Sequence, residues 1–282
     1  MENKFKSLYT DVCIECSSLI TRRYSTSFSM GIRAFDKIYR SPIYSIYGFV
    51  RFADEIVDTF HDQDKKYLLE KFRFDTYEAI ERKISLNPVL EAFQNVVNKY
   101  NIGVDLIDAF LDSMEMDLYD IDFDEPLLKK YIYGSAEAVG LMCLKVFCQG
   151  NQKEYERLVK PARALGSAFQ KVNFLRDMKS DYDFRGRTYF PNVDFLTFNS
   201  SDKITIERVV QEEFDLAYNG IKELPSGARL GVYTAYKYYR ALFKKIKLAD
   251  VAEIKENRIR IPNSRKLILL GSSALKNRLN LL

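Results

Sequence analysis

The chain has 282 residues, of which 47% are apolar and 29% are charged, and its formal net charge at pH 7 is +4. This length allows a sizeable core, and so mild a charge does not indicate a nucleic-acid partner. Glycine (12) and proline (7) are scarce, which favours long helices because sheets need more frequent turns. Four cysteines are too few for a disulfide scaffold at this length, which excludes that class of fold.

Apolar residues recur with helical spacing along most of the chain. Pro42 stands where a first-turn proline is favoured, at the start of a predicted helix over 43–60. Further helical patterns follow in chain order at 64–84, 88–100, 103–119, 126–149, 151–182, 203–223 and 228–248. No alternating strand pattern, internal repeat or linker is visible. The sequence therefore predicts one all-helical domain over residues 1–282.

The first candidate site lies on the predicted helix over 43–60. Tyr47, Arg51, Asp54 and Asp58 follow one another at spacings of three or four, so they share one face of this helix. Such a stripe could serve solubility alone, but the rest of the helix is apolar nearly all round, which is typical of a buried helix. Because buried carboxylates need partners, we expect Asp54 and Asp58 to face a cavity that holds something positive.

A second polar stripe lies on the predicted helix over 151–182. Its members are spaced by three or four residues and are Gly166, Gln170, Asn173, Asp177 and Asp181. The following "RGRTYFP" supplies glycine and proline, which end the helix. By contrast, most of the acid-rich segment 105–125 is interpreted as a solvated helix end and loop.

The residue inventory limits the chemistry of these stripes. His61 is the only histidine, which excludes a zinc site with several histidines, and no glycine-rich phosphate loop is present. Four carboxylates facing one another across a bundle repel unless cations neutralise them. Mg²⁺ typically binds one or two carboxylates together with substrate phosphates. The spacing therefore favours a metal-bridged phosphate ligand, although D-x-x-x-D is also common on exposed helices.

Two further features concern membranes. The N-terminus lacks the apolar segment of a signal peptide, and no apolar run approaches the ~20 residues that span a bilayer, so we expect a cytoplasmic protein. Basic residues gather between 237 and 266, which is typical of a solvated helix face but also suits an anionic substrate or an anionic membrane surface.

The chain resembles the squalene/phytoene synthases, a family of head-to-head prenyltransferases. "YGFVRFADEIVD" at 47–58 and "LGSAFQKVNFLRDMKSDYDFRGRTYFP" at 165–191 are similar to the two aspartate-rich motifs of that family. "YSTSFSMG" at 24–31 resembles its serine-rich diphosphate contact, and "NRIRIPNSRKL" at 257–267 resembles its C-terminal segment. The sequences of these motifs are most similar to those of bacterial phytoene synthases. The resemblance implies the all-α isoprenoid synthase (terpenoid synthase) fold, a helical bundle around a central cavity.

The resemblance also implies roles for individual residues. The catalytic set would be Tyr47, Arg51, Asp54, Asp58, Asp177 and Asp181. The ligands of Mg²⁺, or of Mn²⁺ as an alternative, would be Asp54, Asp58, Asn173, Asp177 and Asp181. The contacts of the substrate would be Tyr24, Ser25, Thr26, Ser27, Tyr47, Arg51, Gln170, Asn173, Arg176, Tyr239 and Arg258.

Two positions depart from the family pattern. Glu55 stands where many members have a second aspartate, but both outer acids of the motif are kept. Thr26 stands where some members carry a basic residue, so that phosphate contact is in doubt, and Arg22 or Arg23 is a candidate to replace it.

The leading expectation from the resemblance is a phytoene synthase, which joins two geranylgeranyl diphosphates through a cyclopropyl diphosphate in carotenoid biosynthesis. The alternative in the same class is a squalene or dehydrosqualene synthase acting on two farnesyl diphosphates, with NADPH needed only for squalene. Two alternatives of other classes are a non-catalytic scaffold relative of the family and a helical adaptor that binds anionic lipid. We expect prenyl diphosphate substrates and no nucleic acid, and peripheral membrane contact is a hypothesis because the product is insoluble in water.

Overall fold

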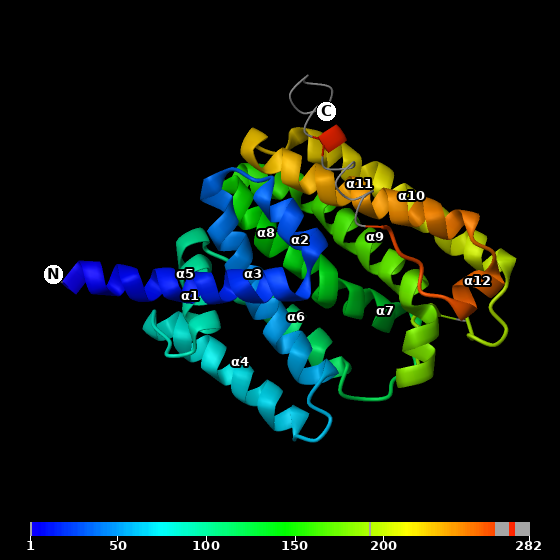
Figure 1. Cartoon of the computed structure of the whole chain (residues 1–282), viewed down its shortest axis with the longest axis horizontal. Coiled ribbons are helices and arrows are strands. Elements are labelled where there is room, and N and C mark those ends of the chain that lie inside the picture. Colours follow the sequence, from blue (N-terminus) through cyan, green and yellow to red (C-terminus); the bar gives the residue numbers. More distant parts are fainter. Residues whose placement is uncertain (1, 192, 263–270, 274–282) are drawn as a thin grey trace.

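The computed structural model describes residues 2–191, 193–262 and 271–273 as an assembly of helices (Figure 1). Helices account for 80% of the described residues, which contain no β-strand, and this confirms the predicted all-α class. The last part of the predicted C-terminal motif, residues 263–267, lies outside the described residues, as do the basic residues Arg265 and Lys266.

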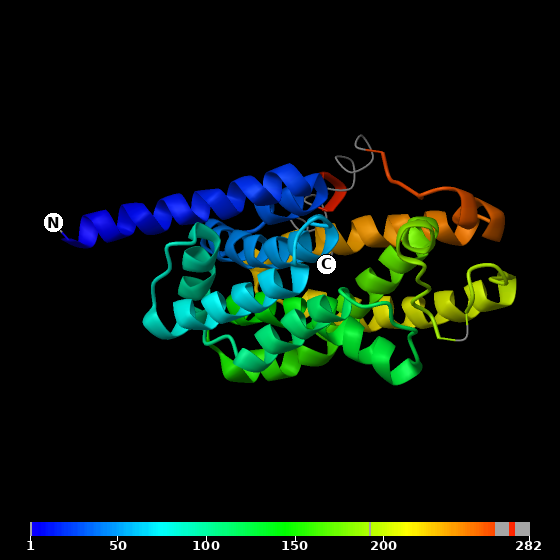
Figure 2. The same ribbon diagram turned by 90° about the horizontal axis from the view of Figure 1, so that it is seen from below.

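The order of the helices follows the predicted pattern, with shifts of a few residues at most ends. The helices are α1 (Glu2–Tyr24), α2 (Thr26–Arg33), α3 (Lys37–Asp58), α4 (Lys65–Arg82), α5 (Pro88–Tyr100), α6 (Val104–Met116), α7 (Glu125–Ile132), the π-helix η1 (Tyr133–Ala138), α8 (Val139–Cys148), α9 (Gln152–Arg185), α10 (Ser200–Glu223), α11 (Ser226–Leu248) and α12 (Val251–Glu256). Of these, α1, α2 and α12 were not predicted. In Figure 2, the N-terminal end of α1 extends past the other helices.

The predicted place of Pro42 in a first turn is wrong. Helix α3 begins at Lys37, five residues before Pro42, and the proline lies inside the helix. Tyr39 accounts for the extension, because its side chain is buried and its ring packs edge-on against Phe147 with centroids 5.6 Å apart. Burial of this aromatic ring stabilises a turn that local sequence would not favour.

Two clusters of buried apolar side chains hold the bundle together. The first joins α3, α5, α6 and α8, where Phe49 stacks on Phe93 with ring centroids 3.9 Å apart. The second joins α9, α10 and α11 around Phe214 and Phe243. Helix α9 is the longest, with 34 residues, and ends as predicted at a glycine, since Gly186 adopts a φ of 61° that favours this residue.

One helical stretch in the described part of the chain, Glu125–Cys148, is long and apolar enough to cross a membrane by composition alone. This corrects the expectation that no apolar run would approach that length. The stretch comprises α7, η1 and α8, and more than half of its most apolar window is buried inside the bundle. Its position in the core accounts for its hydropathy.

Candidate active site

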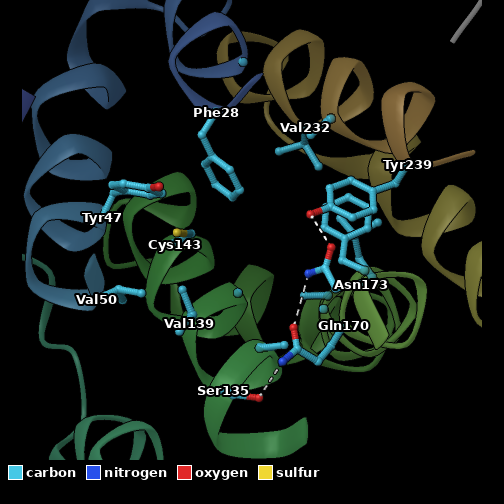
Figure 3. A pocket seen from close by; sticks show the side chains of 18 of the residues that line it. Phe28, Tyr47, Val50, Ser135, Val139, Cys143, Gln170, Asn173, Val232 and Tyr239 are labelled. Atoms are coloured by element: carbon cyan, nitrogen blue, oxygen red, sulfur yellow. Dashed lines mark hydrogen bonds between the residues drawn. The ribbon is translucent and has the colours of Figure 1, made fainter. Parts of the chain in front are cut away.

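A largely apolar cavity of about 640 Å³ lies between the helices of the bundle. Side chains of both buried clusters line it, together with residues of α2. Figure 3 shows Tyr47 and Val50 of α3 on one side of the cavity, and Gln170 and Asn173 of α9 with Tyr239 of α11 on the other. The helices that carry the two predicted acidic stripes therefore face each other across this space.

Most of the predicted site residues come together on the cavity wall. They are Ser27, Tyr47, Arg51, Asp54, Asp58, Gln170, Asn173, Arg176, Asp177, Asp181, Tyr239 and Arg258. Tyr24, Ser25 and Thr26 lie beside the cavity and do not line it. The hydroxyl of Ser25 caps α2 by accepting the backbone N–H of Phe28 at 3.1 Å, whereas Thr26 is exposed.

On the α3 wall, the guanidinium group of Arg51 is held in place by three neighbours. It donates to the carboxylates of Asp54 and Glu55, and the ring of Tyr24 lies 4.3 Å from its central carbon. Burial would raise the pKa of Glu55, but hydrogen bonds from Thr59 and Arg51 hold it below its usual value. The Nε of Arg51 is buried without a hydrogen-bond partner among the described residues, which leaves one donor for an anionic ligand.

Tyr47 lies one helical turn before Arg51 on the same wall. Burial raises the pKa of its phenol, although a hydrogen bond with Ser25 and the charge of Arg51 partly oppose that rise. The group is therefore neutral at physiological pH and able to donate a hydrogen bond. Phe28 points into the cavity beside it, with ring centroids 5.2 Å apart (Figure 3).

On the opposite wall, a ladder of hydrogen bonds crosses from η1 through α9 to α11 (Figure 3). Tyr239 donates to the side-chain oxygen of Asn173 at 3.3 Å, Asn173 donates to Gln170 at 3.4 Å, and Gln170 donates to the hydroxyl of Ser135 at 3.3 Å. Tyr239 also stacks on Phe169 with ring centroids 3.9 Å apart, and burial raises its pKa. Ser135 was not predicted, because nothing in the local spacing signals a π-helix.

A buried network at the cavity wall was also missed. Arg187 donates to Asp117 at 2.8 Å, both side chains are 5% exposed, and Tyr131 donates to the same carboxylate at 3.0 Å. Asp117 and Tyr131 line the cavity. Asp117 is thus an exception to the interpretation of most of residues 105–125 as solvated, because Arg187 compensates its charge inside the bundle. Arg187, the second arginine of "RGR", was the feature of the sequence that could have indicated a buried partner for an aspartate.

The oxygen donors of the site suit a hard divalent ion. Asp54 and Asp58 lie four apart on α3, and Asp177 and Asp181 lie four apart on α9, with Asn173 one turn earlier. Within the described part of the chain, no three His, Cys, Asp or Glu side chains gather closely enough to hold one ion. One or two carboxylates for each ion, completed by phosphate oxygens and water, is the arrangement that Mg²⁺ favours. The residues present therefore fit Mg²⁺ as a bridge to phosphate.

Comparison with known proteins identifies the family. The model of the squalene/phytoene synthase family matches residues 21–265, and the chain belongs to this family. It is 26% identical over 254 residues to a 4,4'-diapophytoene synthase of Staphylococcus haemolyticus, covering 82% of this chain and 86% of that one. It is also 26% identical over 292 residues to a 15-cis-phytoene synthase of Synechococcus elongatus, covering 93% and 92%.

Among solved structures, a dehydrosqualene synthase in complex with a ligand superposes with a TM-score of 0.81 at 20% identity, over 95% of this chain and 98% of that one. This likeness confirms the isoprenoid synthase fold expected from the sequence. The members of the family are transferases of prenyl groups, so the predicted family and enzyme class are confirmed.

Proposed function

We propose that the protein is a phytoene synthase that joins two geranylgeranyl diphosphates head to head in carotenoid biosynthesis. The observation that carries the proposal is the placing of two aspartate pairs on facing helices of one apolar cavity. The relative from Synechococcus elongatus supports the choice of product, because the match extends over nearly all of both chains.

The diphosphates bind to the charged and polar side chains of the cavity wall. Asp54 and Asp58 on one wall, and Asn173, Asp177 and Asp181 on the other, would hold Mg²⁺, since all five line the cavity. When bound, Mg²⁺ supplies charge stabilisation to the departing diphosphate. The remaining contacts to the diphosphate oxygens come from donors of the chain itself, which are Ser27, Tyr47, Arg51, Gln170, Arg176, Tyr239 and Arg258.

The apolar part of the cavity protects the reaction. Departure of diphosphate from one substrate leaves an allylic cation, and the double bond of the second substrate attacks it. Loss of a proton gives a cyclopropyl diphosphate, whose own ionisation, rearrangement and final proton loss give the hydrocarbon. Walls that exclude water prevent capture of the cations as alcohols. Phe28 and Phe169 line the cavity, and an aromatic ring can stabilise such a cation by about 0.5–2 kcal/mol.

A second candidate is a squalene or dehydrosqualene synthase that uses two farnesyl diphosphates. The diapophytoene synthase relative and the dehydrosqualene synthase structure favour it. NADPH is required in this case only if the product is squalene, because hydride delivery replaces the final proton loss.

A product assay separates these candidates. Purified protein is incubated with Mg²⁺ and either geranylgeranyl or farnesyl diphosphate, with and without NADPH, and the hydrocarbons are identified by mass spectrometry. A C40 hydrocarbon formed without NADPH supports the proposal. A C30 hydrocarbon replaces it with the second candidate, and no product from either substrate leads to the non-catalytic scaffold.

We also propose a cytoplasmic enzyme with peripheral membrane contact, because the hydrocarbon product is insoluble in water. Sedimentation with anionic vesicles at low salt tests the contact. Protein that stays wholly in the supernatant contradicts it.

A further inference from the structure

The carboxylate of Asp177 is held by two guanidinium groups at once. Arg176 donates from Nε to Oδ1 at 2.9 Å and from Nη2 to Oδ2 at 2.5 Å. Arg258 donates from Nε to Oδ1 at 2.6 Å and from Nη2 to Oδ2 at 3.3 Å. An ionised carboxylate offers about four lone-pair positions, so these four bonds fill it. Asp177 can therefore ligate a cation only after one guanidinium has left.

Arg258 is the partner that leaves more easily. Its side chain is 48% exposed, whereas that of Arg176 is 19% exposed. An exposed ion pair contributes little to stability, but a buried charge that loses its partner is costly. Arg176 is also the immediate neighbour of Asp177 on α9, whereas Arg258 lies on the irregular segment that follows α12.

The backbone near Arg258 is nevertheless anchored. Ile259 and Ile261 are buried in the cluster formed by α9, α10 and α11. Lys245 donates from Nζ to the carbonyl oxygen of Arg260 at 3.2 Å. The side chain of Arg258 can thus change partners while its backbone stays fixed at the wall of the cavity, which it lines.

We propose that Arg258 is an exchangeable partner of Asp177, which it holds in the free enzyme and leaves for the diphosphate when a divalent cation takes its place. The inference rests on the proposed function. A guanidinium group pairs with phosphate oxygens in the same forked manner as with a carboxylate, so the exchange keeps Arg258 paired throughout. Because of this exchange, bound cation raises the affinity for diphosphate, and bound diphosphate raises the affinity for the cation by the same factor.

Calorimetric titration with Mg²⁺ alone tests the exchange. In Arg258→Gln, the exposed guanidinium group that competes with Mg²⁺ for the carboxylate of Asp177 is absent. The affinity for Mg²⁺ therefore rises by about two- to fivefold, which corresponds to the strength of an exposed ion pair. Arg260→Gln is the matched control, because it removes the same charge two residues away on the same segment. The control leaves the affinity for Mg²⁺ unchanged. An equal rise in both variants overturns the inference, since it then reflects net charge only.

The second arm repeats the titration with inorganic pyrophosphate at buffered free Mg²⁺. The gain in Mg²⁺ affinity caused by pyrophosphate is smaller in Arg258→Gln than in the wild type, with an intermediate value for Arg258→Lys, which keeps the charge but not the fork. An undiminished gain in Arg258→Gln overturns the exchange. Asp177→Asn separates the two proposals: unchanged Mg²⁺ affinity in that variant contradicts the metal site itself and the exchange with it. If Asp177→Asn loses its affinity for Mg²⁺ but Arg258→Gln binds Mg²⁺ and pyrophosphate as the wild type does, the exchange alone is contradicted.

Discussion

Replacing Asp117 by asparagine probes the buried network beside the cavity. The substitution keeps the size of the side chain but leaves the guanidinium group of Arg187 without a carboxylate, in a place where both side chains are 5% exposed. Removing one partner of a buried ion pair costs about 3–5 kcal/mol. Because the backbone carbonyl groups of Asp117 and Tyr119 still accept from Arg187, we expect the lower end, about 3 kcal/mol.

Urea unfolding followed by circular dichroism measures this loss. Asp112→Asn is the matched control, because Asp112 accepts from Arg73 at 2.7 Å but is 44% exposed, and such pairs contribute about 0.2–1 kcal/mol. The double variant Asp117→Asn with Arg187→Gln loses less than the sum of the two single variants, since neither charge is then left alone. A loss in Asp117→Asn no larger than that of the control would show that the buried ion pair contributes no more than an exposed one.

Three further predictions concern the core, the ladder and the α3 wall. Phe49→Ala lowers the free energy of unfolding by about 3–5 kcal/mol, because Phe49 is fully buried and stacks on Phe93. Phe49→Leu is measured in the same denaturation experiment, and a smaller loss in Phe49→Ala than in Phe49→Leu contradicts this prediction. Tyr239→Phe removes the donor to Asn173 and raises the Mg²⁺ concentration for half-maximal activity by up to about tenfold, the value of one hydrogen bond; an unchanged Mg²⁺ dependence argues against the ladder. The lowered pKa of Glu55 means that its stabilising effect is present above its ordinary value of 4.5 and is lost as pH falls through the folded-state value. Glu55→Gln therefore shows a smaller drop in melting temperature below pH 4.5 than the wild type, and parallel curves would count against the assignment.

Most of the bundle was predictable because buried helices repeat their apolar residues every three or four positions. Helix α1 was not predicted because Val12 and Leu19 are exposed, so that its apolar residues do not form one stripe. Helix α2 spans only eight residues, too few for a periodic pattern. The true start of α3 depends on the packing of Tyr39 against Phe147, a contact that local spacing does not contain.

In the candidate site as well, local features were predictable from the sequence and long-range contacts were not. The two aspartate pairs were predictable because spacing of four places them on one face of a helix. The pairing of Asp117 with Arg187 joins residues 70 apart, and that of Asp177 with Arg258 joins residues 81 apart. Contacts of that separation follow from the packed bundle and leave no local pattern in the sequence.

Product formation by Asp54→Asn and by Asp177→Asn, with geranylgeranyl and farnesyl diphosphate and Mg²⁺, tests whether the two aspartate pairs are needed for the prenyl transfer. Asp75→Asn is the control, because Asp75 forms an exposed ion pair with Lys71 on α4. We expect each cavity variant to fold normally and to lose at least about a hundredfold in rate, because a charge-stabilising group is removed, while the control keeps its rate. Folded cavity variants that retain most of the wild-type rate would show that the aspartate pairs do not carry the reaction.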